Sequence, residues 1–144
     1  MALLTWSSRY SVDVESMDKQ HTVLFGFLND LHDAMMNGKA HKITGELLRK
    51  LLEYTRQHFA AEEALMVSAK YPKLEEHRIK HRDLIMQVED FAARFQRGET
   101  ALSVQLLNFL RDWLTNHIQS EDQKYGPWVN GHPTHKSQQH LVHR

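Results

Sequence analysis

Two pairs of potential metal ligands occur in this sequence at a spacing that places both side chains on one face of a helix. His58 and Glu62 are four residues apart, and so are His77 and His81. Residues at positions i and i+4 are neighbours on a helix surface, so each pair can direct its side chains to one point. Imidazole is the commonest side-chain metal ligand in proteins. One such pair is a weak signal, but the two together predict a metal site with nitrogen and carboxylate donors.

Four stretches of the chain are predicted to form the helices that position these side chains. The sequence has only three prolines and six glycines, and the segments between them are rich in Leu, Ala, Met, Glu, Gln and Arg, which favour helix. Short connections favour antiparallel neighbours. The sequence therefore predicts an all-α fold, an up-down-up-down antiparallel four-helix bundle with helices at about 17–37, 40–69, 73–97 and 101–124.

Each predicted helix carries an apolar seam with the period of bundle packing, and each seam is interrupted by histidine. A buried polar group without a partner costs about 1–3 kcal/mol, so seam histidines need polar neighbours or a metal. In an up-down-up-down bundle, the starts of the first and third helices meet the ends of the second and fourth. All five seam histidines then lie within roughly two or three turns of one end. They are His21, His58, His77, His81 and His117.

The fourth predicted helix offers two candidate carboxylates near its histidine. Glu121 follows His117 by four residues and shares its face, whereas Asp122 follows by five. On an ideal α-helix five residues correspond to a rotation of about 140° away from that face. Spacing alone therefore favours Glu121.

As a set, these motifs resemble those of the hemerythrin family in its bacterial form. The resemblance covers residues 1–130 in the family's order and spacing. In that family, a histidine followed five residues later by aspartate supplies a bridging carboxylate, so the resemblance implies Asp122 instead of Glu121. The matching residues are Trp6, 17–21 (MDKQH), Leu24, Phe25, Asn29, 58–63 (HFAAEE), 77–81 (HRIKH), 113–118 (WLTNHI), Asp122 and Tyr125.

The resemblance also implies a centre of two non-haem iron ions. It assigns three histidines to one iron and two to the other, bridged by two carboxylates and a solvent-derived oxygen. These donors are too many for one tetrahedral zinc site; mixed imidazole and carboxylate ligation suits iron, although manganese or zinc could also be loaded. The first iron would take His77, His81 and His117, the second His21 and His58, and the bridges would be Glu62 and Asp122.

An apolar pocket for O2 is expected above the iron with fewer ligands. Leu24, Phe59, Trp113 and Leu114 resemble the residues that line this pocket in the family, although ordinary core packing would also explain them. Tyr125, three residues after Asp122, is the nearest candidate for a hydrogen bond to a ligand, or else a plain aromatic residue at the bundle end.

Reversible O2 binding, as carrier, store or sensor, is the leading functional hypothesis, with no catalytic residue. The alternatives are a di-iron oxidase or peroxidase, a protein that handles nitric oxide, and a bundle whose metal is only structural. Ferritin-like di-iron oxidases use four carboxylates and two Glu-x-x-His pairs, whereas histidine dominates here. The sequence predicts no partner other than O2 and leaves open a fused domain or a downstream protein.

Composition excludes several other classes. Lys and Arg total 18, as do Asp and Glu, which argues against a nucleic-acid-binding protein. The absence of cysteine excludes disulfides, iron–sulfur clusters and thiolate zinc sites. No apolar run is long enough for a membrane helix, and no signal peptide is evident, so a cytoplasmic location is expected.

Two terminal segments are expected to lie outside the helical bundle. Residues 5–16 lack a helical seam and should form an extended arm over it. The predicted bundle domain covers residues 1–130. Residues 131–144 hold four of the 11 histidines with little apolar content, and this tail is expected to be disordered. His32 and His41 are expected to be exposed.

Overall fold

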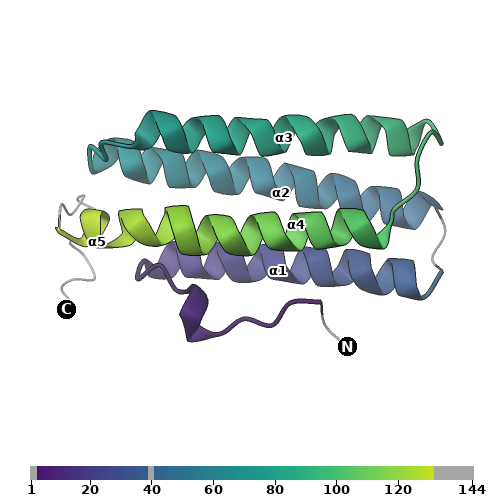
Figure 1. Ribbon diagram of the computed structural model, residues 1–144, viewed down its shortest axis with the longest axis horizontal. Helices are drawn as coiled ribbons and strands as arrows, with labels where there is room; N and C mark the ends of the chain where they lie inside the picture. The colour runs from purple at the N-terminus through teal and green to yellow at the C-terminus, as the bar shows by residue number, and fades with distance from the viewer. Residues whose placement is uncertain (1–2, 39–40, 132–144) are drawn as a thin grey trace.

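Four long helices run antiparallel in the computed structural model, which describes residues 3–38 and 41–131 (Figure 1). The predicted four-helix bundle is confirmed, and the described residues contain no strand. None of the described helices is long and apolar enough to span a membrane. The helices are α1 (Glu15–Met36), α2 (His41–Ser68), α3 (Leu74–Gln96) and α4 (Val104–His117).

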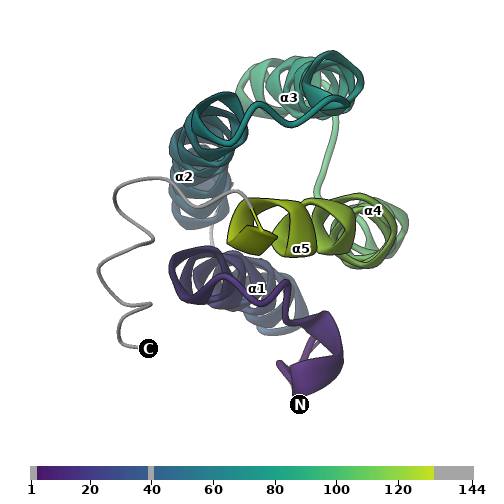
Figure 2. The same ribbon diagram turned by 90° about the vertical axis from the view of Figure 1, so that its left-hand side faces the viewer.

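The core lies along the inner faces of the four long helices. Leu28, Leu31, Leu48 and Leu107 are all buried between the helices, where removal of apolar surface from water provides the main driving force for folding. Helix α2 packs against both α1 and α3, and α4 packs against α1. The end-on view in Figure 2 shows the four helices surrounding one shared interior. That shared interior is where the seam histidines meet.

The N-terminal arm is present and is fastened to α1 by side chains of that helix. Asn29 accepts a hydrogen bond from the backbone of Leu4 at 2.8 Å and donates one back to it at 2.9 Å. Asp18 accepts from the backbone N–H of Val12 at 2.8 Å. The arm is not extended throughout, because Ser8–Tyr10 forms one turn of 3₁₀-helix and buries the ring of Tyr10. It lies beside α1 in Figure 1.

The fourth helix does not end near residue 124 as expected. It continues through a π-helical segment, η2 (Ile118–Asp122), into α5 (Gln123–Gly131), with Pro127 inside α5. Proline removes a backbone donor and bends a helix, and Figure 2 shows α5 turning away from α4 across the end of the bundle. Packing holds the extension in place, since the indole N–H of Trp128 donates to the carbonyl of Ala69 at 2.7 Å.

Three further expectations concern the exposure of His41 and His32 and the C-terminal tail. His41 is exposed, as predicted, and stacks on Phe95 with ring centroids 4.1 Å apart. His32 is half-buried and not exposed, because it follows the fully buried Leu31 at the edge of the packed face of α1. The predicted disordered tail lies, from residue 132 onward, outside the described residues.

Candidate metal centre

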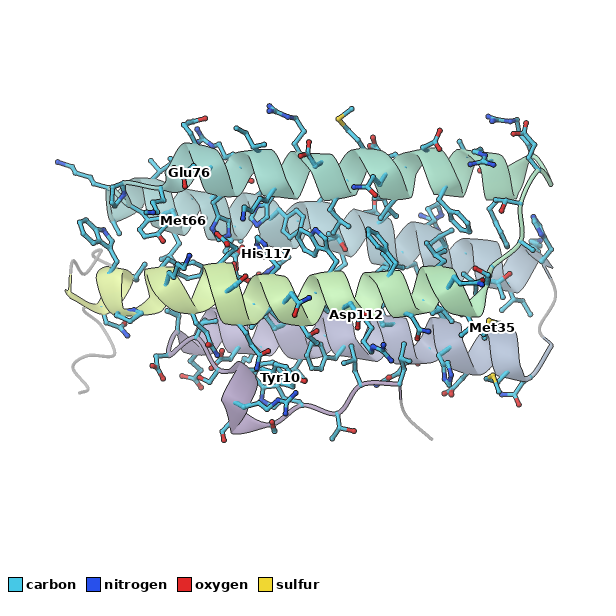
Figure 3. The ribbon with its side chains drawn as sticks, in the orientation of Figure 1. Tyr10, Met35, Met66, Glu76, Asp112 and His117 are labelled. Carbon is cyan, nitrogen blue, oxygen red and sulfur yellow. The ribbon has the colours of Figure 1, made fainter. Side chains whose placement is uncertain are left out.

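The seven ligands proposed from the sequence meet at one end of the bundle. They come from all four long helices and from η2, and none exposes more than 5% of its surface. Figure 3 shows His117 directed from α4 into the space between the helices. Burial of so many polar groups together requires that they satisfy one another or a bound ion. The seven are His21, His58, Glu62, His77, His81, His117 and Asp122.

Three imidazoles point their Nε2 atoms at one another. The Nε2 atom of His117 lies 3.2 Å from that of His81 and 3.1 Å from that of His77. A metal–imidazole bond of about 2.1 Å places two adjacent donors on one ion roughly 3 Å apart. The spacing within this three-histidine group (His77, His81, His117) is therefore the spacing of donors around a single metal.

Glu62 lies between the three-histidine group and the remaining pair, the two-histidine group (His21, His58). Its Oε1 is 3.1 Å from Nε2 of His81, and its Oε2 is 3.3 Å from Nε2 of His21 and 3.5 Å from Nε2 of His58. One oxygen thus faces each group. A carboxylate divided in this way is placed to bridge two ions.

Asp122 divides its oxygens in the same manner. Its Oδ1 lies 2.9 Å from Nε2 of His77 and 3.1 Å from Nε2 of His117. Its Oδ2 lies 3.2 Å from Nε2 of His21. The two carboxylates therefore connect the same two groups of histidines from opposite helices, which gives two metal positions and not one.

Several of these atoms are short of hydrogen-bond partners. His21 Nε2, Glu62 Oε1 and Asp122 Oδ1 are buried and have no hydrogen bond among the described residues, although each lies close to another ligand. Each such atom costs about 1–3 kcal/mol when left unsatisfied. Cations at the two shared positions would satisfy all three, so the residues present fit a metal pair.

The π-helical segment determines which carboxylate enters the site. Its wider turn, closed by i→i+5 hydrogen bonds, inserts one residue after His117 and brings Asp122 to the interior. Glu121 is instead 20% exposed and lies with its Oε2 atom 3.0 Å from Lys80 Nζ. The structure thus brings Asp122 into the cluster, as the resemblance implied, and leaves out the residue that α-helical spacing favoured.

The electrostatics of the cluster hold its carboxylates ionised. Burial and the neighbouring Glu62 would raise the pKa of Asp122, but His117 and His21 hold that pKa well below its usual range. Burial alone would lower the pKa of His21, yet Asp122 and Glu62 raise it to about 9. The pKa of His77 is also raised to about 9, with burial opposed by the same carboxylates. Without metal, protons occupy positions from which a metal ion would release them.

Two further side chains, to which the sequence analysis gave no role, hold the outer nitrogens of ligands. Nδ1 of His58 donates to Gln20 Oε1 at 2.6 Å, and Nδ1 of His81 donates to Glu63 Oε2 at 2.8 Å. Such bonds fix the ring and leave Nε2 free for a metal. The sequence signals are adjacency to a ligand, since Gln20 precedes His21 and Glu63 follows Glu62, and membership of the two matching motifs at 17–21 and 58–63.

Tyr125 and the expected pocket residues also lie at the centre. The phenol of Tyr125 donates to Glu62 Oε2 at 2.7 Å. Phe59 stacks on His81 with centroids 3.6 Å apart, and Trp113 stacks on His117 at 4.4 Å. Both rings restrict the orientation of the imidazole beneath them.

A small cavity opens beside these rings. It offers about 30 Å³ to a water-sized molecule, enough for one or two small molecules. Thr55 is the one polar residue in a lining otherwise formed by Leu, Ile, Val, Phe and Trp, so the space favours a nonpolar gas over water. All four residues predicted for the O2 pocket line it: Leu24, Phe59, Trp113 and Leu114.

The chain belongs to the hemerythrin family. Residues 12–129 match the family model described as the hemerythrin HHE cation binding domain. The chain is 36% identical to bacteriohemerythrin of Stenotrophomonas maltophilia (strain R551-3), a match that covers 97% of this chain and 90% of that one. It is 35% identical to bacteriohemerythrin of Methylococcus capsulatus (strain ATCC 33009 / NCIMB 11132 / Bath), over 90% and 99% of the two chains.

Solved structures agree with the sequence comparison. The fold matches a crystal structure of wild-type hemerythrin with a TM-score of 0.85 and 33% identity, covering 89% of this chain and 98% of that one. The likeness therefore extends over nearly the whole domain.

Proposed function

We propose that this protein binds O2 reversibly at a pair of non-haem iron ions held by the seven buried ligands. One observation carries the proposal: Glu62 and Asp122 each turn one oxygen to the three-histidine group and the other to His21 of the two-histidine group. This arrangement defines two linked metal positions with unequal numbers of nitrogen donors. The inequality leaves room for a ligand on one side only.

The donor count assigns that room to the two-histidine group. Three imidazoles and two carboxylate oxygens would hold the first iron, and a solvent-derived oxygen would bring its donors to six. His21, His58, Glu62 and Asp122 would hold the second iron, and a solvent-derived oxygen would bring its donors to five. When bound, the iron pair supplies the two electrons with which O2 is held.

The surrounding residues favour holding O2 over consuming it. The lining of the cavity, which includes Leu24 and Leu114, is almost entirely apolar, and an apolar environment disfavours departure of reduced oxygen as a charged species. Burial raises the pKa of Tyr125 well above its ordinary value, so its phenol keeps its proton and remains a hydrogen-bond donor to Glu62. We therefore place this protein among O2-binding proteins and not among enzymes.

The proposal is compatible with three physiological roles. A carrier, a store and a sensor domain all require reversible binding, and residues 1–130 contain every proposed ligand. O2 is the one partner proposed, and a cytoplasmic location remains a prediction from the sequence.

Optical spectroscopy of the iron-loaded, reduced protein tests this function. Exposure to air should produce a charge-transfer band that fades under vacuum and returns with air. Irreversible oxidation coupled to rapid substrate consumption would instead indicate an oxidase, and two bound zinc ions without any response to O2 would indicate a structural metal. His77→Ala should lower the iron content, and retention of two irons by this variant would contradict the assignment of His77.

A further inference from the structure

The hydrogen bonds that Gln20 and Glu63 accept from ligand Nδ1 atoms differ in the charge of the acceptor. His58, in the two-histidine group, donates from Nδ1 to the neutral amide oxygen of Gln20 at 2.6 Å. His81, in the three-histidine group, donates from Nδ1 to the carboxylate of Glu63 at 2.8 Å. The distances are similar, so the difference between the two sides lies mainly in the chemistry of the acceptor.

Glu63 is held in place by a second contact. Its Oε1 lies 3.5 Å from Nε of Arg78, and Arg78 also binds Glu75 at 2.6 Å. The side chain of Glu63 is 25% exposed, at a surface groove between α2 and α3 that reaches the edge of His81. The carboxylate therefore connects the solvent-facing side of the bundle to one buried ligand.

A carboxylate acceptor changes the reduction potential of the metal ion that its histidine binds. When Nδ1–H donates to an anion, the proton is drawn partly from the ring, and Nε2 becomes a more basic, more electron-donating ligand. A more donating ligand stabilises the higher oxidation state of iron. A neutral amide draws on the Nδ1 proton less strongly and has a smaller effect.

We propose that Glu63 is a positioning residue whose negative charge makes the iron of the three-histidine group the more easily oxidised of the pair. This inference rests on the proposed iron pair. The first electron given up by the reduced centre then comes from the iron bound by His77, His81 and His117, away from the side where O2 is proposed to bind. Gln20 leaves the other iron with the higher reduction potential.

Orientation alone is the competing role for Glu63. Phe59 already stacks on the His81 ring at 3.6 Å, nearly parallel at 2°, so the ring has a second support. Glu63→Gln separates the two roles, because glutamine keeps an acceptor oxygen at the same reach and removes the charge. Glu63→Ala removes both.

The test measures reduction potentials of the full-length, iron-loaded protein without O2. Glu63→Gln should raise the potential while two irons remain bound. Gln20→Glu should lower the potential, and Arg78→Ala, which removes the cation beside Glu63, should also lower it. Glu63→Ala should in addition weaken iron binding about 10- to 100-fold, the range typical of lost outer partners of metal ligands.

Mössbauer spectra of the one-electron-oxidised protein identify which iron is ferric. The wild type should have its ferric ion in the site with three nitrogen donors, and the double exchange Gln20→Glu/Glu63→Gln should move it to the site with two. An unchanged potential in Glu63→Gln, with iron lost only in Glu63→Ala, would show that Glu63 merely orients His81. These measurements need no O2, so a centre that bound O2 irreversibly would contradict the proposed function and leave this inference standing. A wild-type chain without two irons would overturn both.

Discussion

At the scale of single residues, the decisive difference lies between two adjacent carboxylates. Asp122 is buried between His77, His117 and His21, whereas Glu121 lies near Lys80 at the surface. Side chains of similar chemistry one position apart thus have separate roles. Only the local backbone distinguishes them.

Paired substitutions test this assignment. Asp122→Asn should weaken iron binding by at least about 10- to 100-fold, because it removes a charged bridge and leaves buried imidazoles without their counter-ion. Glu121→Gln, the matched control one residue away, should retain wild-type iron content because it disturbs only an exposed ion pair, worth roughly 0–1 kcal/mol. The measurement is iron per chain after equilibration with a competing chelator. Equal iron loss in both variants would contradict the assignment.

The raised pKa of His21 predicts how the metal-free protein responds to pH. Burial lowers that pKa, but Asp122 and Glu62 raise it overall from 6.5 to about 9. A raised folded-state pKa contributes stability that is complete below 6.5 and is lost as pH rises through about 9. Chelator-treated protein should therefore unfold at a lower temperature at pH 9 than at pH 6.5.

The matched control for this pH dependence is His21→Gln, which lacks the titrating ring and should lose less stability over the same interval. Iron-loaded wild type should not follow the metal-free trend, since metal binding requires neutral imidazole. A metal-free melting temperature that rose between pH 6.5 and 9 would contradict the account of this cluster.

At the scale of the elements, hydrophobic period and punctuation predicted the first three long helices to within two residues at each end, and the start of the fourth to within three. Those signals could not predict the π-helical segment, because a seam analysis assumes 3.6 residues per turn throughout. They also placed a break at Gly126 and Pro127, where packing of Trp128 on Ala69 sustains α5 instead. Local sequence carries no direct signal of such tertiary contacts.

The lack of a local signal for tertiary contacts also explains which site residues could be predicted from the sequence. Six of the seven ligands are recognisable from the sequence, because the five histidines and Glu62 stand on helical seams at helical spacings. Gln20 and Glu63 meet their histidines 38 and 18 residues away, so only a packed structure reveals their partners. The resemblance, and not the geometry of an ideal helix, pointed to Asp122.

Contact between α5 and the arm predicts a steric effect at one glycine. A Cβ atom added to Gly126 would lie 1.9 Å from the carbonyl oxygen of Val12, so Gly126→Ala must push the arm and α5 apart. We expect a loss of about 1–3 kcal/mol from overpacking. Thermal unfolding should register about 2–4 °C per kcal/mol for a chain of this size.

Gly26→Ala is the matched control in α1, because nothing lies within 4 Å of the added atom. Replacing an exposed helical glycine by alanine should stabilise the protein by about 1 kcal/mol. If both variants changed the melting temperature in the same direction, the result would contradict close packing of α5 on the arm.

At the scale of the whole molecule, the bundle places a polar ligand cluster next to an apolar cavity. Polar ligands occupy one end, closed by α5, and an apolar cavity follows directly beneath them. Phe59 belongs to both, since it lines the cavity and stacks on His81. A nonpolar gas in this cavity would lie against Phe59 and Trp113, the rings that stack on the metal ligands His81 and His117.

The most direct test of this account is the stoichiometry of O2 uptake by the reduced, iron-loaded chain. Manometric titration together with an iron assay should give two irons per chain and one O2 taken up for each pair, released again on evacuation. Uptake without release, or a chain saturated by a single metal ion, would contradict reversible binding at a bridged iron pair.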